Sequence, residues 1–451
     1  MDTVDLLITA RWILPIAPDH SVLENYAVLL RGDRIVDLLP REHAMQRYSA
    51  KHTLELKDHV LMPGMVNAHT HTPMNLFRGL ADDLPLMSWL NNHIWPAEGE
   101  LINAESVTTG TRLAIAEMIR GGTTCFNDNY FFHDVIAQTA IEAGMRACVG
   151  FVIMSVPTKW AQEETGYFNK MMSTLDQLKK HPLITWSIAP HAPYTVSDNS
   201  LRRVKELSDQ WQLPIHMHMH EAAPEIASSI KEFGMRPLAR INKLGLLSPR
   251  FINVHMTQLT EDEIKLVKET GAHVVHCPES NLKLASGYSP VVSLMNEGIN
   301  VALGTDGAAS NNDLDMWGEL RTASLLAKDK TQDPTSLPAK QALAMATIHG
   351  AKALGLEKEI GSIEPGKAAD LIAINLASYL TQPIYSPISH LAYAVNRLQV
   401  SDVWIAGKRV LKNGEFTQLK IDSIVEEAKQ WAEKASPFKA DISTTHKEEV
   451  S

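Results

Sequence analysis

The stretch Met62-Pro63-Gly64-Met65-Val66-Asn67-Ala68-His69-Thr70-His71 is an apolar run that ends in two histidines one residue apart. In a β-strand, residues i and i+2 point to the same face, so His69 and His71 can present both imidazole rings to one object. A metal ion is the most economical such object. Two histidines also fall at this spacing by chance in ordinary loops, so the metal needs support from the rest of the chain.

That support comes from four later strand-like runs, each of which ends in histidine or aspartate. These ends carry His216, His218 and His220 followed by Glu221, then His255, then His276 with Cys277, and finally Asp306. Any one of these residues alone is more often a core histidine or a turn aspartate. As a set at consecutive strand ends they favour a metal site. Because the histidines of the first run share one strand face, spacing does not choose among them.

Strand-like and helical runs alternate through the middle of the chain. The eight candidate strands lie near residues 59–69, 122–127, 146–153, 184–190, 214–219, 251–256, 273–277 and 300–305, and helices are expected at 105–119, 200–211 and 260–269. Eight βα repeats over about 300 residues predict a (β/α)8 TIM-type barrel, here 61–361, with catalytic residues at the carboxyl ends of its strands. A doubly wound open sheet is the alternative, but no Gly-x-Gly-x-x-Gly motif follows a strand.

Both ends of the chain are rich in short β-strands. The runs lie at 5–10, 26–30 and 35–39 before the barrel and at 369–374 and 403–411 after it, and Arg31-Gly32-Asp33-Arg34 forms a hairpin turn among them. We therefore predict a small β-sandwich domain composed of 1–60 and 362–420. A C-terminal amphipathic helix is expected within 421–440, and a flexible tail over 441–451.

The composition is that of an ordinary globular protein, with 45% hydrophobic and 21% charged residues. Lys and Arg number 42 against 52 Asp and Glu, a net charge of −10, so we expect no nucleic-acid partner and no membrane partner. The cysteines Cys125, Cys148 and Cys277 are too widely spaced for a disulfide framework or a Cys-x-x-Cys zinc site. With no signal-like N-terminus and no bilayer-spanning run, we expect a cytoplasmic protein.

The order of the motifs resembles the metal-dependent amidohydrolase superfamily, in the branch that deaminates purines and related heterocycles. The motifs are His-x-His, His-x-His-x-x-Glu, a lone histidine, His-Cys-Pro-x-Ser-Asn-x-Lys-Leu-x-x-Gly and Thr-Asp-Gly. The resemblance implies that His69, His71, His218 and Asp306 bind one divalent metal per subunit. Three imidazoles and a carboxylate suit Zn²⁺, with Fe²⁺ as the alternative. No metal-bridging lysine ends the fourth strand, so a mononuclear site is expected.

Carried over to this chain, the family pattern also implies catalytic roles for three residues. Glu221 would protonate a ring nitrogen, and His255 would stabilise charge on the attacking oxygen. Asp306 would take the proton of a water activated by the metal and deliver it to the departing ammonia. Without the histidines beside it, Glu221 would be taken for a solvated loop acid. His276 and Cys277 are expected to be structural, and neither Asn281 nor Lys283 receives a role.

The segment from Trp89 to Glu98 resembles the substrate loop of the 5′-methylthioadenosine/S-adenosylhomocysteine deaminase family. In that family a glutamate at the position of Glu98 binds the ribose hydroxyls, and a histidine at the position of His191 binds the purine. A carboxylate suits two vicinal hydroxyls, because both are donors. We expect Trp89 to contact the substrate too. The alternative is that Trp89 only packs and that Glu98 is a surface acid.

One departure from the family pattern bears on the choice of substrate. Relatives that hold the amino-acid tail of S-adenosylhomocysteine use arginines after the third strand, where this chain has only Lys159, and lysine lacks a bidentate fork. We therefore predict a zinc-dependent deaminase that prefers 5′-methylthioadenosine to S-adenosylhomocysteine, with adenosine as a further substrate. The alternatives are a guanine, oxopurine or s-triazine aminohydrolase or chlorohydrolase and, more remotely, a non-catalytic interaction protein. A homo-oligomer, dimer or tetramer, is expected by analogy of fold.

Overall fold

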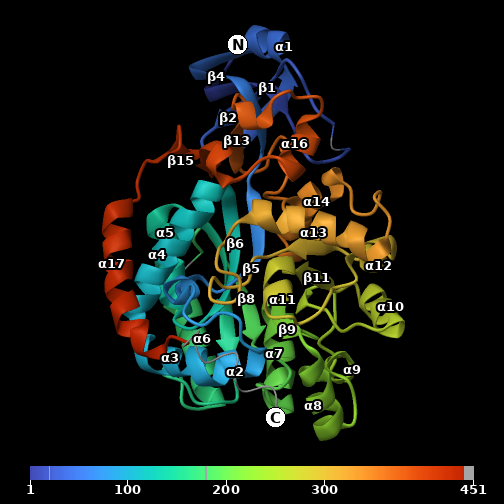
Figure 1. The fold of residues 1–451 in the computed structure, drawn as a ribbon. Coiled ribbons are helices and arrows are strands. Elements are labelled where there is room, and N and C mark those ends of the chain that lie inside the picture. The colour runs from blue at the N-terminus through green and yellow to red at the C-terminus, as the bar shows by residue number, and fades with distance from the viewer. Residues whose placement is uncertain (20, 178–179, 441–451) are drawn as a thin grey trace.

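The computed structural model describes residues 1–19, 21–177 and 180–440, so the tail predicted at 441–451 lies outside the described residues. The chain forms two large sheets surrounded by helices (Figure 1). One sheet consists of eight parallel strands that follow one another in chain order: β5 (Met65–Thr70), β6 (Thr123–Tyr130), β7 (Arg146–Ile153), β8 (Ile184–Pro190), β9 (Ile215–Met219), β10 (Phe251–His255), β11 (His273–His276) and β12 (Val301–Leu303).

This parallel sheet closes into a barrel at the seam between its first and last strands. Just after β12, the backbone N–H of Asp306 donates a hydrogen bond to the carbonyl oxygen of His69 in β5, at 3.0 Å. Gly304 permits the close approach, because a Cβ atom there would lie 2.8 Å from the backbone nitrogen of His69. The predicted TIM-type barrel is confirmed, and its closure places Asp306 beside the histidines of the first strand.

Helices cover the outside of the barrel, as the alternating pattern predicts. Their bounds are α4 (Ala104–Gly121), α5 (His133–Ala143), α6 (Glu164–Gln177), α7 (Asp198–Trp211), α8 (Ala223–Phe233), α9 (Pro237–Lys243), α10 (Glu261–Thr270), α11 (Pro278–Lys283), α12 (Val291–Asn296), α13 (Met316–Thr331), α14 (Ala339–Met345) and α15 (Ile348–Ala353). Helix α10 begins with a capping box, in which Thr260 accepts from the backbone of Glu263 and Glu263 accepts from the backbone of Thr260.

The second sheet is built from both ends of the chain. Its order is β16-β15-β14-β13-β4-β1-β2-β3, with β1 (Asp2–Ile13), β2 (Tyr26–Arg31), β3 (Arg34–Pro40), β4 (Tyr48–Pro63), β13 (Leu371–Asn375), β14 (Val400–Ile405), β15 (Lys408–Lys412) and β16 (Glu415–Phe416). Ile8 and Leu61 from the first end share one buried apolar cluster with Leu371 and Trp404 from the other. The separate end domain of the predicted fold class is therefore confirmed. Short helical segments join its strands: α1 (Arg41–Arg47), η3 (Tyr379–Thr381), α16 (Pro387–Tyr393) and η4 (Arg397–Gln399).

One of the predicted strands is wrong, because it is in fact two strands. The run at 59–69 divides at Gly64 into β4 of the end sheet and β5 of the barrel. A side chain could not be placed on Gly64, since its Cβ would lie 2.1 Å from Oγ1 of Thr124 in β6. The run at 403–411 is a hairpin of β14 and β15 that turns at Ala406 and Gly407. The residue numbers at which the end domain gives way to the barrel stay a prediction.

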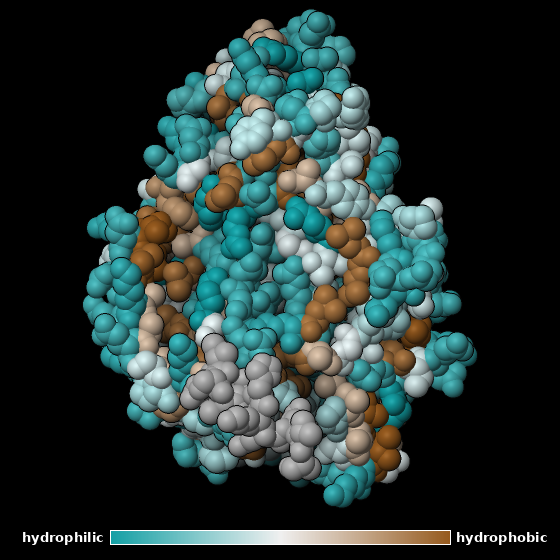
Figure 2. Space-filling model, viewed as in Figure 1, coloured by the Kyte–Doolittle hydropathy of each residue, from teal (hydrophilic) through white to brown (hydrophobic). Residues whose placement is uncertain are grey.

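The amphipathic helix predicted after the end sheet is α17 (Ile421–Ala435), which returns along the outside of the barrel. Its Trp431 and Ala435 are buried in the main apolar core. Figure 2 shows apolar side chains on the inner side of α17, at the left edge of the molecule, and polar ones on its outer side. Among the described residues, no helix combines the length and the apolarity needed to cross a membrane.

Candidate active site

Four side chains converge at the carboxyl end of the barrel. His69 comes from β5, His71 directly follows it, His218 comes from β9 and Asp306 follows β12, and their nearest potential ligand atoms all lie within 4.8 Å of one another. We call these four residues the metal cluster. Nε2 of His69 and Nε2 of His71 each lie 3.2 Å from Oδ1 of Asp306. Ligands held about 2.1 Å from a tetrahedral zinc ion are about 3.4 Å apart, so these two separations fit such an ion.

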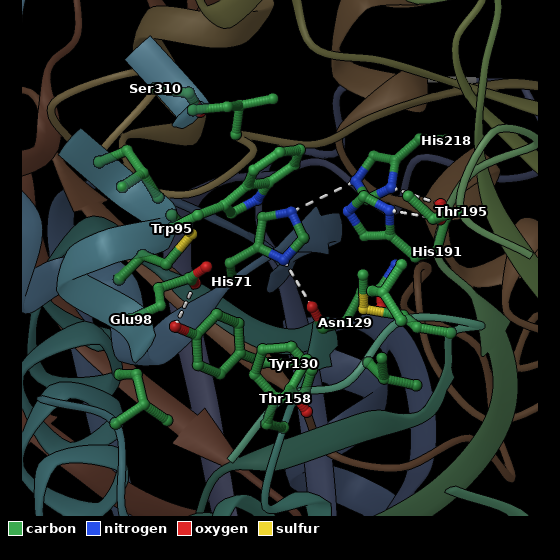
Figure 3. Close-up of a pocket in the computed structure, with 18 of the residues that line it drawn as sticks. His71, Trp95, Glu98, Asn129, Tyr130, Thr158, His191, Thr195, His218 and Ser310 are labelled. Carbon is green, nitrogen blue, oxygen red and sulfur yellow. Dashed lines mark hydrogen bonds between the residues drawn. The ribbon is translucent and has the colours of Figure 1, made fainter. Parts of the chain in front are cut away.

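The second ring nitrogens of two cluster histidines are held by backbone carbonyl groups. Nδ1 of His71 donates to the carbonyl oxygen of Asn129 at 2.5 Å, and Nδ1 of His218 donates to that of His191 at 2.7 Å. Because a carbonyl only accepts, each ring carries its proton on Nδ1 when neutral and turns the lone pair of Nε2 into the cluster. Figure 3 shows these contacts at the wall of the cavity.

The structure separates the three histidines of β9 that spacing left equivalent. His218 enters the metal cluster. His216 lies one step below it, with its Nε2 atom 3.2 Å from Nδ1 of His69. His220 belongs elsewhere, since its Nε2 accepts a hydrogen bond from the backbone N–H of Leu238 at 3.0 Å. His216 therefore supports a member of the cluster, whereas His220 anchors the start of α9.

Burial and mutual contact set the charges of the cluster. Burial lowers the pKa of His218 to about 4 and that of His69 well below its usual range, so both rings are neutral. Although burial alone would raise the pKa of Asp306, hydrogen bonds from His69 and His71 hold it well below the usual range. Asp306 in turn raises the pKa of His71 against the effect of burial. A cation that binds here would therefore meet a carboxylate anion and displace a proton from His71.

Two further predicted residues lie beside the cluster. Nε2 of His255 is 4.0 Å from Oε2 of Glu221, so the two side chains face one point above the metal cluster. Burial raises the pKa of Glu221 to about 7. The backbone N–H of Glu221 donates to Oε2 of Glu225 at 2.7 Å, which fixes the chain at this bend. Glu221 therefore keeps a proton at near-neutral pH, as a general acid requires.

Three residues that touch the reacting groups were missed from the sequence. Oδ2 of Asp306 accepts hydrogen bonds from the hydroxyls of Ser280 and Ser310, both at 2.7 Å. Oδ1 of Asn281 accepts from Nδ1 of His255 at 2.9 Å. Ser280 and Asn281 belong to the His-Cys-Pro-x-Ser-Asn motif. The motif was visible in the sequence, but the sequence did not show which side chains these two residues contact.

The metal cluster opens into a cavity of about 400 Å³. Three short helices after β5 form one wall, namely α2 (Leu86–Trp89), the π-helical turn η2 (Leu90–Ile94) and α3 (Trp95–Leu101). The predicted substrate residues Trp89, Glu98 and His191 all line this cavity. Most of the remaining lining is apolar, with side chains that include Leu86, Leu90, Ile94, Trp95, Ile102, Val152, Met154 and Trp160.

Glu98 and His191 are the polar groups of that wall. Glu98 accepts a hydrogen bond from the hydroxyl of Tyr130, and burial raises its pKa to about 7 (Figure 3). The surface-acid alternative for Glu98 is therefore wrong. Nδ1 of His191 lies 3.0 Å from Oγ1 of Thr195, which leaves its other nitrogen for a ligand. Burial lowers the pKa of His191 well below its usual range, so the ring is neutral.

The amidohydrolase family model matches residues 60–410. The chain belongs to the amidohydrolase family. The amidohydrolase is 46% identical over 432 residues to the 5-methylthioadenosine/S-adenosylhomocysteine deaminase of Teredinibacter turnerae, an alignment that covers 96% of this chain and 98% of the relative. It is 39% identical over 435 residues to the 5′-deoxyadenosine deaminase of Methanothermobacter thermautotrophicus, covering 94% of this chain and 97% of that one.

Among solved structures, the amidohydrolase is similar to an adenosine deaminase from Xanthomonas campestris with bound zinc. The TM-score is 0.95 at 51% sequence identity, and the match covers 97% of this chain and 99% of the other. The resemblance predicted from the motifs is thus confirmed. Together with the complete metal cluster, it identifies a metal-dependent aminohydrolase and argues against the non-catalytic alternative.

Proposed function

We propose that the amidohydrolase deaminates 5′-methylthioadenosine, so that water replaces the amino group of the adenine ring and ammonia leaves. The observation that carries this proposal is that one cavity contains both a carboxylate suited to ribose hydroxyls and the groups needed for hydrolysis. The half-buried carboxylate of Glu98 lines the cavity, and so do members of the metal cluster with Glu221 and His255 beside them. A cavity of about 400 Å³ suits a nucleoside.

His69, His71, His218 and Asp306 would hold one zinc ion per subunit. The convergence of three imidazoles and a carboxylate supports this assignment, as do the 3.2 Å separations of His69 and His71 from Asp306 and the zinc in the adenosine deaminase structure. When bound, a divalent metal supplies a water activated near neutral pH. Imidazole and carboxylate ligands also suit Fe²⁺, so measurement of the metal content of the purified protein tests the choice.

Side chains of the site would then carry out the proton transfers. Glu221 gives its proton to the ring nitrogen next to the reacting carbon, which draws electrons away from that carbon. His255 stabilises the charge on the attacking oxygen through Nε2, which donates when the ring carries a proton on both nitrogens, because Asn281 holds the other proton on Nδ1. Asp306 accepts the proton that the attacking water releases and passes it to the departing amino group. As ammonia leaves, the hydroxyl group on the reacting carbon returns a proton to Glu221 and becomes the carbonyl group, so the steps balance to one water consumed and one ammonia released.

Substrate recognition falls to the cavity wall. Glu98 would accept hydrogen bonds from both ribose hydroxyls, while His191 and Trp89 would contact the purine. The apolar side chains of Val152, Met154 and Trp160 suit a methylthio group at the 5′ position. These roles are supported by the common placement of the residues around one cavity.

The same wall disfavours an amino-acid tail. Lys159 lines the cavity, and its ammonium group already donates to the carbonyl oxygen of Glu100. Among the described residues that line the cavity, the carboxylate of S-adenosylhomocysteine would therefore find no arginine and only a lysine that is partly engaged. We propose a preference for 5′-methylthioadenosine, with 5′-deoxyadenosine and adenosine as related substrates. The homo-oligomeric state and cytoplasmic location expected from the sequence remain predictions.

The decisive experiment mixes the zinc-loaded protein with 5′-methylthioadenosine and follows the change from an adenine to a hypoxanthine chromophore, with ammonia measured in parallel. We expect one ammonia per adenine lost, and no reaction with His255→Ala or Asp306→Ala. Turnover of guanine or an s-triazine but of no adenosine would overturn the proposal. A catalytic efficiency on S-adenosylhomocysteine equal to or above that on 5′-methylthioadenosine would overturn the preference.

A further inference from the structure

Helix α11 comes from the sequence motif to which no role was assigned. Two consecutive residues of this helix each contact a different reacting group. The hydroxyl of Ser280 donates to Oδ2 of Asp306 at 2.7 Å, and Oδ1 of Asn281 accepts from Nδ1 of His255 at 2.9 Å. Both side chains are buried. Neither residue lines the cavity, so both act through their neighbours and do not touch a substrate.

We propose that Ser280 and Asn281 are positioning residues, which hold Asp306 for metal binding and His255 for catalysis. The assignment rests on the proposed function, because it takes the roles of Asp306 and His255 from that proposal. The assignment also gives α11 a function, because one turn of this helix orients two catalytic groups, Asp306 and His255, that come from different strands.

The contact with Asp306 governs which oxygen faces the metal cluster. Oδ2 is occupied by the hydroxyls of Ser280 and Ser310, whereas Oδ1 lies 3.2 Å from Nε2 of both His69 and His71. Two donors on one oxygen prevent the carboxylate from rotating and leave the other oxygen as the ligand. Loss of the Ser280 hydroxyl removes half of that restraint.

The contact with His255 governs which nitrogen faces the cavity. An amide oxygen can only accept, so Nδ1 of His255 carries the proton and Nε2 turns toward Glu221, 4.0 Å away. Among the described residues, Nδ2 of Asn281 has no hydrogen-bond partner, so this single bond is what the amide contributes. Because the acceptor is neutral, it orients the ring without adding a charge beside the reacting groups.

The helix itself is fastened at both ends. Its backbone N–H at Glu279 donates to Oε2 of the buried Glu319 at 3.3 Å. At the other end, Lys283 donates to Oδ1 of Asp82 at 2.7 Å and to the carbonyl oxygen of Ala309 at 3.3 Å. These anchors join α11 to the segment after β5 and to the loop after β12. A helix anchored on both sides of the barrel seam can hold its neighbours at fixed positions.

The first test measures zinc affinity by competition with a chelator. We expect Ser280→Ala to weaken zinc binding by about 10- to 100-fold, the usual effect of losing a residue that orients a ligand. The matched control is Ser289→Ala, since Ser289 is also buried and its hydroxyl has no partner among the described residues. Zinc affinity of Ser280→Ala equal to that of the control would overturn the role of Ser280.

The second test compares Asn281→Ala with Asn281→Asp, which keeps an acceptor oxygen in place. We expect Asn281→Ala to lower kcat by about 10- to 100-fold at nearly unchanged KM and zinc affinity, and Asn281→Asp to recover much of that loss. An equal loss in both variants, with KM and thermal stability moving together, would mean that Asn281 only packs.

The outcome can be separated from that of the proposed function. If the zinc-loaded wild type deaminates no adenosine, the proposed function fails, yet zinc affinity still decides the role of Ser280. The role of Asn281 is then decided by nitrogen NMR of the metal-free protein with labelled histidine. The Nδ1–H signal that disappears in His255→Gln should persist in Asn281→Asp and be lost in Asn281→Ala; its persistence in both would overturn the role.

Discussion

The hydroxyl of Tyr130 donates a hydrogen bond to the carboxylate of Glu98, inside the cavity that the metal cluster also lines. Tyr130 ends β6, whereas Glu98 lies in α3, so the contact joins the wall after β5 to the barrel. It also turns the carboxylate into the cavity and still leaves it acceptor capacity. A half-buried carboxylate with free lone pairs is a suitable partner for two sugar hydroxyls.

Replacement of Glu98 by Ala should separate nucleosides from free bases. Hydrogen bonds to a charged group contribute about 1.5–3 kcal/mol each, so losing two of them should lower kcat/KM on 5′-methylthioadenosine by at least about 100-fold. Turnover of free adenine, which has no ribose, should change little. Tyr130→Phe is the control that keeps the carboxylate and removes only its partner, and it should cost about tenfold or less. A loss of equal size on adenine would contradict the ribose contact.

The rate should fall as the pH rises through about 7. Burial raises the pKa of Glu221 to about 7, and a general acid works only in its protonated form, which is the form present below that pKa. Glu98, whose pKa burial also raises to about 7, has the opposite requirement, because the ionised form accepts hydrogen bonds best. We therefore expect kcat to decline above neutrality while KM improves. Glu98→Gln should remove the pH dependence of KM and leave that of kcat, as steady-state kinetics on both sides of neutrality would show.

The barrel and the pairing of two histidines follow from local sequence patterns, whereas most of the site was implied by the family resemblance. The i, i+2 spacing of His69 and His71 places both rings on one face, and that inference needs no tertiary structure. The choice among the histidines of β9 requires the tertiary structure, because the two-residue repeat of a strand puts all three on the same face. Depth along the barrel decides it: His218 lies level with the metal cluster, His216 lies below it, and His220 has left the strand with a φ of 51°.

The positioning residues escaped prediction for a related reason. Ser280 and Asp306 are 26 residues apart, as are Asn281 and His255, and they meet only because α11 folds back over the strand ends. The repeating pattern of apolar and polar residues along the sequence does not reveal contacts between residues so far apart. The false strand at 59–69 arose because Gly64, which divides it, stands in an unbroken apolar run.

His216 should matter for metal binding although it is not a ligand. Its Nε2 atom lies 3.2 Å from Nδ1 of His69, so it fixes the ring that presents Nε2 to the cluster. We expect His216→Ala to weaken zinc binding by about 10- to 100-fold in a chelator competition. His276→Ala is the matched control, since His276 is buried in the barrel and has no hydrogen-bond partner among the described residues. If the two variants bind zinc equally, His216 merely fills space.

The C-terminal segment should control substrate affinity from outside the barrel. After α17, the backbone N–H of Ala440 donates to the carbonyl oxygen of Leu80 at 3.0 Å, and the carbonyl oxygen of Phe438 accepts from Nδ1 of His93 at 2.8 Å. His93 lies in η2, between Trp89 and Glu98 of the cavity wall. The reacting groups stand at the ends of barrel strands, whereas the contacts named here reach the wall segment after β5.

We therefore expect His93→Ala, and a chain ended at Ala435, to raise KM for 5′-methylthioadenosine while kcat stays nearly constant. One lost hydrogen bond costs roughly 1 kcal/mol, so His93→Ala should raise KM about fivefold, and the truncation, which removes both bonds, should raise it further. His390→Ala is the control, because Nδ1 of that histidine bonds to the carbonyl oxygen of Ser386, at the start of its own helix. A fall in kcat at constant KM would contradict this prediction, because it would show that the segment acts on the reacting groups and not on the cavity wall.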